Sequence, residues 1–285
     1  SCSSRSSNTD NEDNSIESED ESEQGSYSTA SEDQVIVRIP EFPVQIITLE
    51  RCERTLDYLL MNEELAGKEL GSAIMQILIM LITYQKAFGL THNDLHTNNI
   101  MYVTTEKQFL FYKFNNKYYK VPTFGKIFKI IDFGRAIYKF RGNVICSDSF
   151  HPKGDAATQY NFEPYFDDKK PRLEPNYSFD LCRLGCSMFD FIVEDIDKIN
   201  DVTSPIEKII LEWCNDDKGR NILYKNNGDE RYPDFKLYKM IARTVHNHEP
   251  SKVIEKDYFQ IFTIGKKKIN KSHKIFNIDN IPSYQ

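Results

Sequence analysis

The sequence has few features of a zinc-binding, membrane-spanning or nucleic-acid-binding protein. Its six cysteines form no C-x-x-C pair and have no histidine at a zinc-ligand spacing, so we expect no zinc site and reduced thiols. The longest apolar stretch, residues 73–82, is too short to cross a bilayer. No charged segment followed by an apolar one opens the chain, so we expect no secretory signal. The formal net charge is −7, and outside residues 1–34 the chain is close to neutral, so nothing in the composition argues for nucleic acid as the main partner.

The negative charge is concentrated in residues 1–34. This segment holds ten Asp and Glu residues, one arginine and eleven serines, whereas residues 35–285 are close to neutral. With almost no aliphatic side chains it cannot bury enough apolar surface to offset the entropy of ordering, so we expect a disordered acidic linker. A phosphoacceptor tail is the alternative, because Ser7 and Ser18 each have an acidic residue three positions later.

Three short motifs in the rest of the chain carry chemistry. Residues 92–99 read H-x-D-L-x-x-x-N, residues 132–134 read D-F-G, and residues 180–185 read D-x-x-x-x-G. Phosphoryl transfer needs a carboxylate that orients the attacking hydroxyl and oxygen ligands that hold magnesium. The first two motifs supply these groups, and both belong to a known signature set for that reaction.

In this order the motifs resemble those of the eukaryotic-like protein kinase superfamily. The resemblance implies an α+β, protein-kinase-like fold with a mainly α-helical large lobe and a β-rich small lobe, and it implies ATP and magnesium as ligands. By the same resemblance, Asp94 accepts the proton of the substrate hydroxyl. Asn99 and Asp132 hold magnesium, while His92 and Asp180 brace the catalytic loop.

The segment ahead of the motifs is similar to the end of a kinase small lobe. Residues 42–50 are β-branched and apolar, which predicts a strand. By the resemblance, Leu49 stands at the gatekeeper position, and Glu50, Arg51 and Cys52 form the hinge whose backbone groups bind adenine. We therefore expect an acidic segment over 1–34, a small-lobe strand remnant and hinge over 35–52, and a large lobe over 53–285.

The large lobe is predicted to contain a buried helix and an additional hairpin. Residues 69–88 are apolar on every face, which is typical of a buried helix, and Gly89 should end it. Residues 109–121 predict a hairpin around Asn-Asn-Lys that enlarges the link before the D-F-G motif. Residues 126–131 predict the strand that delivers Asp132.

The spacing after the D-F-G motif favours a protein substrate with a Ser or Thr hydroxyl. Asp132 and Asp180 lie 48 positions apart, which leaves room for an activation segment and a peptide-docking platform. Small-molecule kinases of the aminoglycoside phosphotransferase type usually have a shorter connection. His96, however, stands where serine/threonine kinases usually carry lysine, and residues 94–99 also resemble the loop of those small-molecule enzymes. His96 is therefore a candidate phosphate or substrate contact and keeps that alternative open.

Several parts of the kinase pattern are missing. The sequence contains no G-x-G-x-x-G, no V-A-I-K lysine and no A-P-E, although in kinases that lysine helps to position the ATP phosphates. The chain also begins without methionine, and we interpret it as a fragment of a longer kinase that is inactive on its own. Asn93 replaces the Arg of H-R-D that reads an activation-loop phosphate, so we expect activity that does not depend on such phosphorylation.

Two further interpretations concern functional class and origin. A catalytically inactive pseudokinase scaffold that binds partners is the alternative from a different functional class. The abundance of Asn, Ile, Lys, Tyr and Phe suggests an A/T-rich genome. Together with the diverged motifs, it makes the chain similar to protein kinases of large DNA viruses. That resemblance implies a location in the host cytoplasm or the virion.

Overall fold

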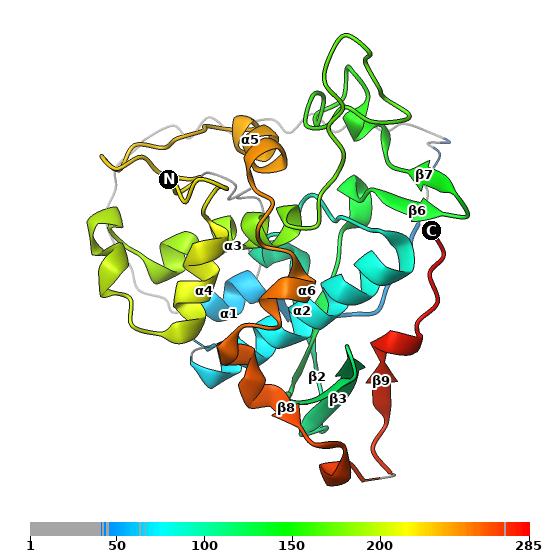
Figure 1. Ribbon diagram of the computed structural model, residues 1–285, viewed down its shortest axis with the longest axis vertical. Coiled ribbons are helices and arrows are strands. Elements are labelled where there is room, and N and C mark those ends of the chain that lie inside the picture. Colours follow the sequence, from blue (N-terminus) through cyan, green and yellow to red (C-terminus); the bar gives the residue numbers. More distant parts are fainter. Residues whose placement is uncertain (1–40, 42, 44–45, 63, 66, 271) are drawn as a thin grey trace, which may run out of the picture. The chain divides into compact units, whose positions relative to one another are not determined.

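The computed structural model describes residues 41, 43, 46–62, 64–65, 67–270 and 272–285. By its internal contacts the chain divides into a unit of residues 3–50 and a main unit that contains residues 51–285. Helices and small sheets are mixed in the main unit (Figure 1), so its fold class is α+β, as the sequence predicts.

The elements of the main unit have the following bounds. The α-helices are α1 (Leu56–Met61), α2 (Lys68–Phe88), α3 (Phe179–Ile192), α4 (Pro205–Trp213), α5 (Lys236–Thr244) and α6 (Pro250–Val253). The strands are β1 (Arg54–Thr55), β2 (Ile100–Thr104), β3 (Phe109–Phe114), β4 (Lys117–Pro122), β5 (Lys126–Ile130), β6 (Tyr138–Phe140), β7 (Asn143–Ile145), β8 (Thr263–Ile264) and β9 (Ile275–Asn277). Two short 3-10 helices, η1 (Thr97–Asn99) and η2 (Phe133–Arg135), lie within the first two motifs.

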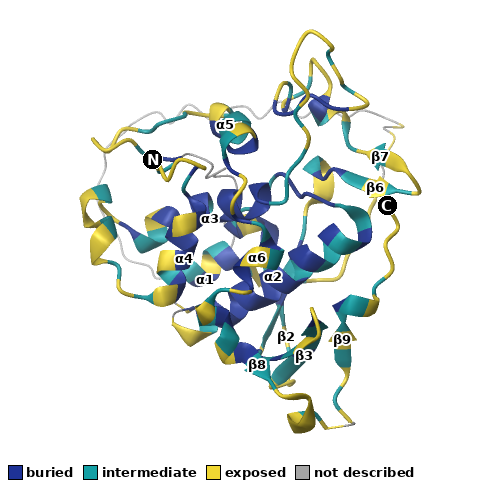
Figure 2. Cartoon of the chain, in the orientation of Figure 1, coloured by how far each residue is buried: buried dark blue, intermediate teal, exposed yellow. Residues whose placement is uncertain are grey.

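α2 is the buried helix that the apolar pattern predicts. Its side chains are buried on most faces, and Figure 2 shows dark blue concentrated on α2 and α3. Gly89 ends it in the left-handed region (φ 56°), and its N–H donates to the carbonyl of Gln85 at 2.8 Å. By length and composition α2 could cross a membrane, but 78% of its apolar window is buried inside the protein.

A three-stranded antiparallel sheet beside α2 sets the position of the first two motifs. Its order is β1-β2-β5, and Ile100 at the start of β2 pairs with Ile130 at the end of β5. The H-x-D-L-x-x-x-N motif leads into β2, whereas β5 leads out to the D-F-G motif. The backbone N–H of Ile131 donates to the carbonyl of Asn99 at 3.0 Å. Two motifs that are distant in sequence therefore meet at one end of this ladder, and the predicted strand before Asp132 is confirmed.

The predicted hairpin is confirmed and belongs to a larger sheet. β3 and β4 pair antiparallel around Asn115 and Asn116, which both have positive φ, a conformation that asparagine tolerates better than most residues. β8 joins β4 and β9 joins β3, so the order is β8-β4-β3-β9. The sequence does not predict the two outer strands, because they contain only 2 and 3 residues.

The strand predicted over residues 42–50 is wrong for its described part. Residues 46–50 have no regular secondary structure, and Ile46, Ile47 and Leu49 are 82%, 77% and 76% exposed. A strand needs a neighbour for its backbone hydrogen bonds, and within the described residues none pairs with this segment. The small-lobe strand remnant is therefore not formed by residues 46–50. The predictions for residues 1–34, 35–40, 42 and 44–45 lie outside the described residues.

α3 organises the second half of the core. It packs against α4 and α5, and its buried aromatic side chains join a cluster that includes Leu237 and Ile241 of α5. Two charged residues of α3, Asp180 and Arg183, are buried with this apolar face. Both charges therefore need partners inside the protein. Asp180 bonds to the loop of residues 92–99, and Arg183 bonds to Tyr238.

Candidate active site

The loop of residues 92–99 is held in place by Asp180 of α3. The carboxylate of Asp180 accepts hydrogen bonds from the backbone N–H groups of His92 and Asn93, each at 2.9 Å. All three residues are buried. Burial raises the pKa of Asp180, while the neighbouring His92 and the two backbone donors act in the opposite direction. Two buried hydrogen bonds from Asp180 therefore hold the start of this loop.

The His92 ring connects the loop to the D-F-G segment. Its Nε2 lies 2.9 Å from the carbonyl oxygen of Ile131, and its Nδ1 accepts from the N–H of Asp94 at 3.3 Å. These two bonds fit the neutral ring protonated on Nε2. The ring also packs on Phe133, with 5.2 Å between centroids. His92 therefore ties the loop to Ile131 and Phe133, the two neighbours of Asp132.

Asp94 is reached by side chains from two other parts of the chain. Its Oδ1 accepts a hydrogen bond from the hydroxyl of Tyr238 at 2.7 Å, and its Oδ2 lies 4.0 Å from a guanidinium nitrogen of Arg135. The Asp94 side chain is 21% exposed. One face of this carboxylate is thus engaged by the protein, and the other keeps access to solvent.

Tyr238 is in turn held by a buried cation. Nε of Arg183 donates to the Tyr238 oxygen at 2.9 Å, and the Phe235 ring stacks on the Tyr238 ring with 4.9 Å between centroids. Burial raises the pKa of the Tyr238 phenol, so the hydroxyl remains protonated near neutral pH. Arg183, Tyr238 and Asp94 therefore form a chain of hydrogen bonds from the protein interior to the surface.

Asn99 and Asp132 have the chemistry of magnesium ligands. The Nδ2 of Asn99 donates to the backbone carbonyl of Asp94 at 3.0 Å, which leaves its Oδ1 as the end that can bind a cation. Asp132 is exposed, and its carboxylate accepts from the N–H of Gly134 at 3.2 Å. In the described part of the chain no group of three His, Cys, Asp or Glu residues could hold a metal by itself. Magnesium usually takes one or two protein ligands and completes its shell with phosphate and water, so this donor set fits it.

His96 belongs to the loop of residues 92–99, is half-buried and lies close enough to Arg183 to be affected by its charge. Burial lowers the pKa of His96, and the nearby positive charge of Arg183 lowers it further. The ring is therefore neutral at physiological pH, so it can donate or accept a hydrogen bond there but is not a cation. It does not reproduce the charge of the lysine that the family pattern carries at this position.

The three predicted hinge residues fall at the boundary between the two units. Glu50 is the last residue of the unit 3–50, and Arg51 and Cys52 open the main unit. Glu50 and Arg51 are exposed, Cys52 is half-exposed, and all three lie in irregular chain just before β1. Their predicted contact with adenine remains a prediction.

Asn93 makes contacts that the motif does not predict. It is fully buried, and its Nδ2 donates to the carbonyl oxygens of Thr91 and Arg135 at 3.2 and 3.1 Å. Its Oδ1 accepts a hydrogen bond from the hydroxyl of Tyr160. Asn93 therefore joins the loop to the segment that follows the D-F-G motif through neutral groups alone.

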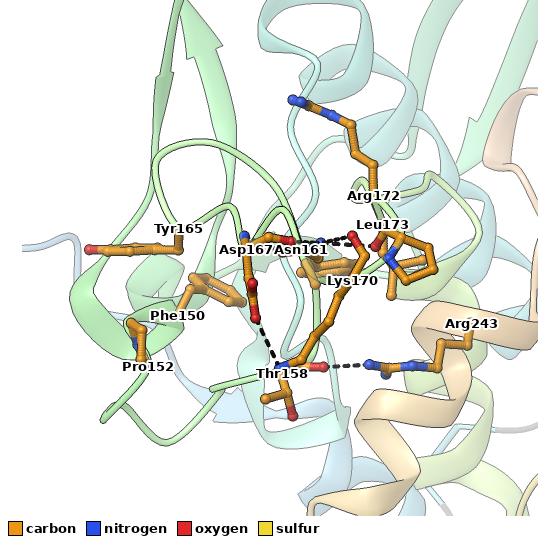
Figure 3. A pocket seen from close by; sticks show the side chains of 12 residues that line it. Phe150, Pro152, Thr158, Asn161, Tyr165, Asp167, Lys170, Arg172, Leu173 and Arg243 are labelled. Carbon is orange, nitrogen blue, oxygen red and sulfur yellow. Dashed lines mark hydrogen bonds and ion pairs between the residues drawn. The ribbon is translucent and has the colours of Figure 1, made fainter.

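A cavity of about 480 Å³ is lined in part by Tyr160. Figure 3 shows its wall, which is formed by the segment of residues 150–173 and by Arg243, which projects from α5. Nδ2 of Asn161 donates to the carbonyls of Asp167, Lys170 and Pro171 at 2.9–3.0 Å, which holds that segment in a closed turn. The lining combines aromatic rings with cationic side chains.

Arg243, one of the cationic side chains in this wall, is bonded to backbone carbonyls. Its guanidinium donates to the carbonyls of Thr158 at 2.6 Å and Lys239 at 2.7 Å. Lys170 and Arg172, by contrast, form ion pairs with Asp167 and Glu174. Of the three cationic side chains in this lining, Arg243 is therefore the one that forms no ion pair with a carboxylate of the described residues.

The sequence did not identify Tyr238, Arg183 or Tyr160 as parts of the site. Arg183 carried a weak signal, because it is a charged residue within the apolar third motif. Tyr238 carried none, since it lies 144 positions after Asp94. No protein-family model and no curated protein sequence matches this chain, so any assignment of function rests on its own residues and their geometry.

Proposed function

We propose that the chain is the catalytic part of an ATP- and magnesium-dependent protein kinase that phosphorylates Ser or Thr hydroxyls. One observation carries the proposal. Two motifs that are distant in sequence meet at one end of the β2–β5 ladder and bring with them Asp94, Asn99 and Asp132. The loop of residues 92–99 is held by hydrogen bonds of His92 and Asp180. A protein kinase needs a proton acceptor and magnesium ligands held close together, and this arrangement supports that interpretation of the motifs.

The proposed chemistry assigns one task to each group. The substrate hydroxyl oxygen attacks the γ-phosphorus of ATP, the bond to the bridging oxygen of ADP breaks, and the Asp94 carboxylate accepts the hydroxyl proton. Asn99 and Asp132 would hold magnesium, which neutralises charge on the phosphates when it is bound. Residues 50–52 would contribute backbone groups to adenine, as the family resemblance implies.

A protein substrate is favoured over a small molecule by the region after the D-F-G motif. The cavity beside Tyr160 is formed by that region and by Arg243 of α5. Through the Tyr160–Asn93 contact it adjoins the residue next to Asp94. A side chain near the acceptor hydroxyl of a protein substrate could bind in it, and Arg243 would favour an acidic one.

The first test addresses the proton acceptor. In the full-length natural protein that contains this chain, we expect Asp94→Asn to lower turnover on a protein substrate by roughly 10²–10⁴-fold, the usual range for general acid–base groups, with little change in ATP affinity. An Asp94→Asn variant as active as the wild type would refute the assignment. Transfer to aminoglycosides without transfer to protein would favour the small-molecule alternative.

The second test addresses magnesium. We expect ATP to raise the unfolding temperature of the wild type more strongly with magnesium present, and Asp132→Ala to abolish that magnesium-dependent difference, because a site with few protein ligands cannot lose one cheaply. Asp168→Ala, which removes an exposed carboxylate after the motif, is the matched control. Magnesium-dependent ATP binding without any phosphoryl transfer would instead indicate a pseudokinase scaffold.

A further inference from the structure

We propose that Tyr238 is a positioning residue for phosphoryl transfer: held by Arg183, it orients the Asp94 carboxylate so that Oδ2 faces the substrate hydroxyl. This inference rests on the proposed kinase function. It adds Tyr238 and Arg183, to which the motifs assign no role. It is carried by the contacts on both sides of a single phenolic oxygen.

The hydrogen bonds around Tyr238 have only one consistent direction. Arginine can only donate, so Nε of Arg183 donates to the phenolic oxygen at 2.9 Å. The single phenolic hydrogen is then free to point at Oδ1 of Asp94, 2.7 Å away. This chain of bonds therefore fixes Oδ1 of Asp94 as the acceptor of the Tyr238 hydroxyl.

The phenol is fixed from several sides. Leu237 and Ile241, its neighbours on α5, are buried in the core, and Arg183 on α3 is 2% exposed. The Phe235 ring covers the Tyr238 ring at 4.9 Å with an angle of 9° between the planes. A side chain held in this way keeps one rotamer, so it is suited to orienting its partner.

The same contacts leave one oxygen of Asp94 for the substrate. Oδ1 is taken by Tyr238, whereas Oδ2 lies 4.0 Å from Arg135, beyond hydrogen-bond distance. The Arg135 guanidinium carbon lies 5.5 and 5.6 Å above the Phe235 and Tyr238 rings. Arg135 and Arg183 therefore place positive charge around Asp94 from two directions, while His96 at the usual lysine position is neutral.

The activity test uses Tyr238→Phe in the full-length natural protein. Losing a hydrogen bond to a charged acceptor should lower kcat by roughly 10–100-fold. KM for ATP and for the protein substrate should change little, because neither is bound by the phenol. Tyr232→Phe, which removes a hydroxyl just ahead of the same helix, is the matched control and should keep wild-type turnover. A lower kcat at unchanged KM is the result that a purely structural defect would not produce.

Unchanged or raised turnover in Tyr238→Phe overturns the inference; raised turnover would mean that the phenol blocks the acceptor position. If wild type and Asp94→Asn are equally active or equally inactive, the proposed kinase function fails instead. The contact itself is still tested in that case by unfolding midpoints of Tyr238→Phe, Asp94→Asn and the double variant. A coupled pair gives a double variant whose shift differs from the sum of the single shifts. Additive shifts would overturn the inference without reference to activity.

Discussion

The hydroxyl of Tyr160 donates a hydrogen bond to Oδ1 of Asn93, and both side chains are buried. This contact joins the segment after the D-F-G motif to the loop that carries Asp94. In the family pattern an arginine at the position of Asn93 reads a phosphate, which is a charged and reversible connection. Here the connection is made by two neutral side chains. The expectation that activity does not require phosphorylation of this segment stays a prediction.

Tyr160→Phe should destabilise the protein. The substitution leaves the buried Oδ1 of Asn93 without its donor, and an unpaired buried polar group costs about 1–3 kcal/mol. The free energy of unfolding from urea denaturation is the measurement. Tyr165→Phe removes a phenol hydroxyl from the same segment and serves as the control. Equal stabilities of the two variants would show that the Tyr160–Asn93 bond contributes nothing.

Asp180→Ala should be more destabilising than Asp180→Asn. The alanine variant removes both acceptors of the buried N–H groups of His92 and Asn93, at about 1–3 kcal/mol for each group left unpaired. Asparagine keeps one acceptor oxygen and should lose less. The exposed Asp168→Ala is the control. Denaturant unfolding of the three variants tests this order, and a stable Asp180→Ala protein would contradict the bracing role.

Arg243→Ala should weaken binding of the protein substrate and spare ATP. Its guanidinium lines the cavity beside Tyr160 and is held there by the carbonyls of Thr158 and Lys239. We expect KM for a substrate with an acidic residue near its acceptor hydroxyl to rise about tenfold, the loss of one charge-assisted hydrogen bond. Arg243→Lys, which keeps the charge, should recover part of the loss. An equal rise in KM for ATP would point to a general defect instead.

His96 should make stability depend on pH just below neutrality. Its pKa in the folded protein lies below the usual 6.5, because burial and Arg183 disfavour the charged ring. As pH falls through 6.5 the unfolded chain takes up the proton first, so the free energy of unfolding decreases until the folded-state pKa is reached. His96→Asn should flatten this part of the stability–pH curve. If the free energy of unfolding has the same slope against pH in wild type and variant between pH 7 and 5, folding does not lower the pKa of His96.

Much of the main unit follows from local sequence patterns. The all-round apolar character of residues 69–88 predicts α2, and Gly89 predicts its end; both are confirmed. Asn115 and Asn116 between two β-rich runs predict the β3–β4 hairpin, which is also present. These predictions succeed because periodicity and turn chemistry act over a few residues. The apolar residues 46–50 carry the same kind of signal and form no strand, because strand formation also requires a neighbour.

The sequence by itself determined which chemical groups the candidate site contains, since Asp94, Asn99 and Asp132 belong to recognisable motifs. The tertiary structure alone decided what surrounds them. The packing of α5 on α3 brings Tyr238 to Asp94 across 144 positions, and the segment after the D-F-G motif brings Tyr160 to Asn93 across 67. No local pattern encodes such contacts, because they depend on how apolar faces of separate helices and loops pack together. The reactive groups are therefore readable in short motifs, whereas their orientation and charge environment are properties of the folded core.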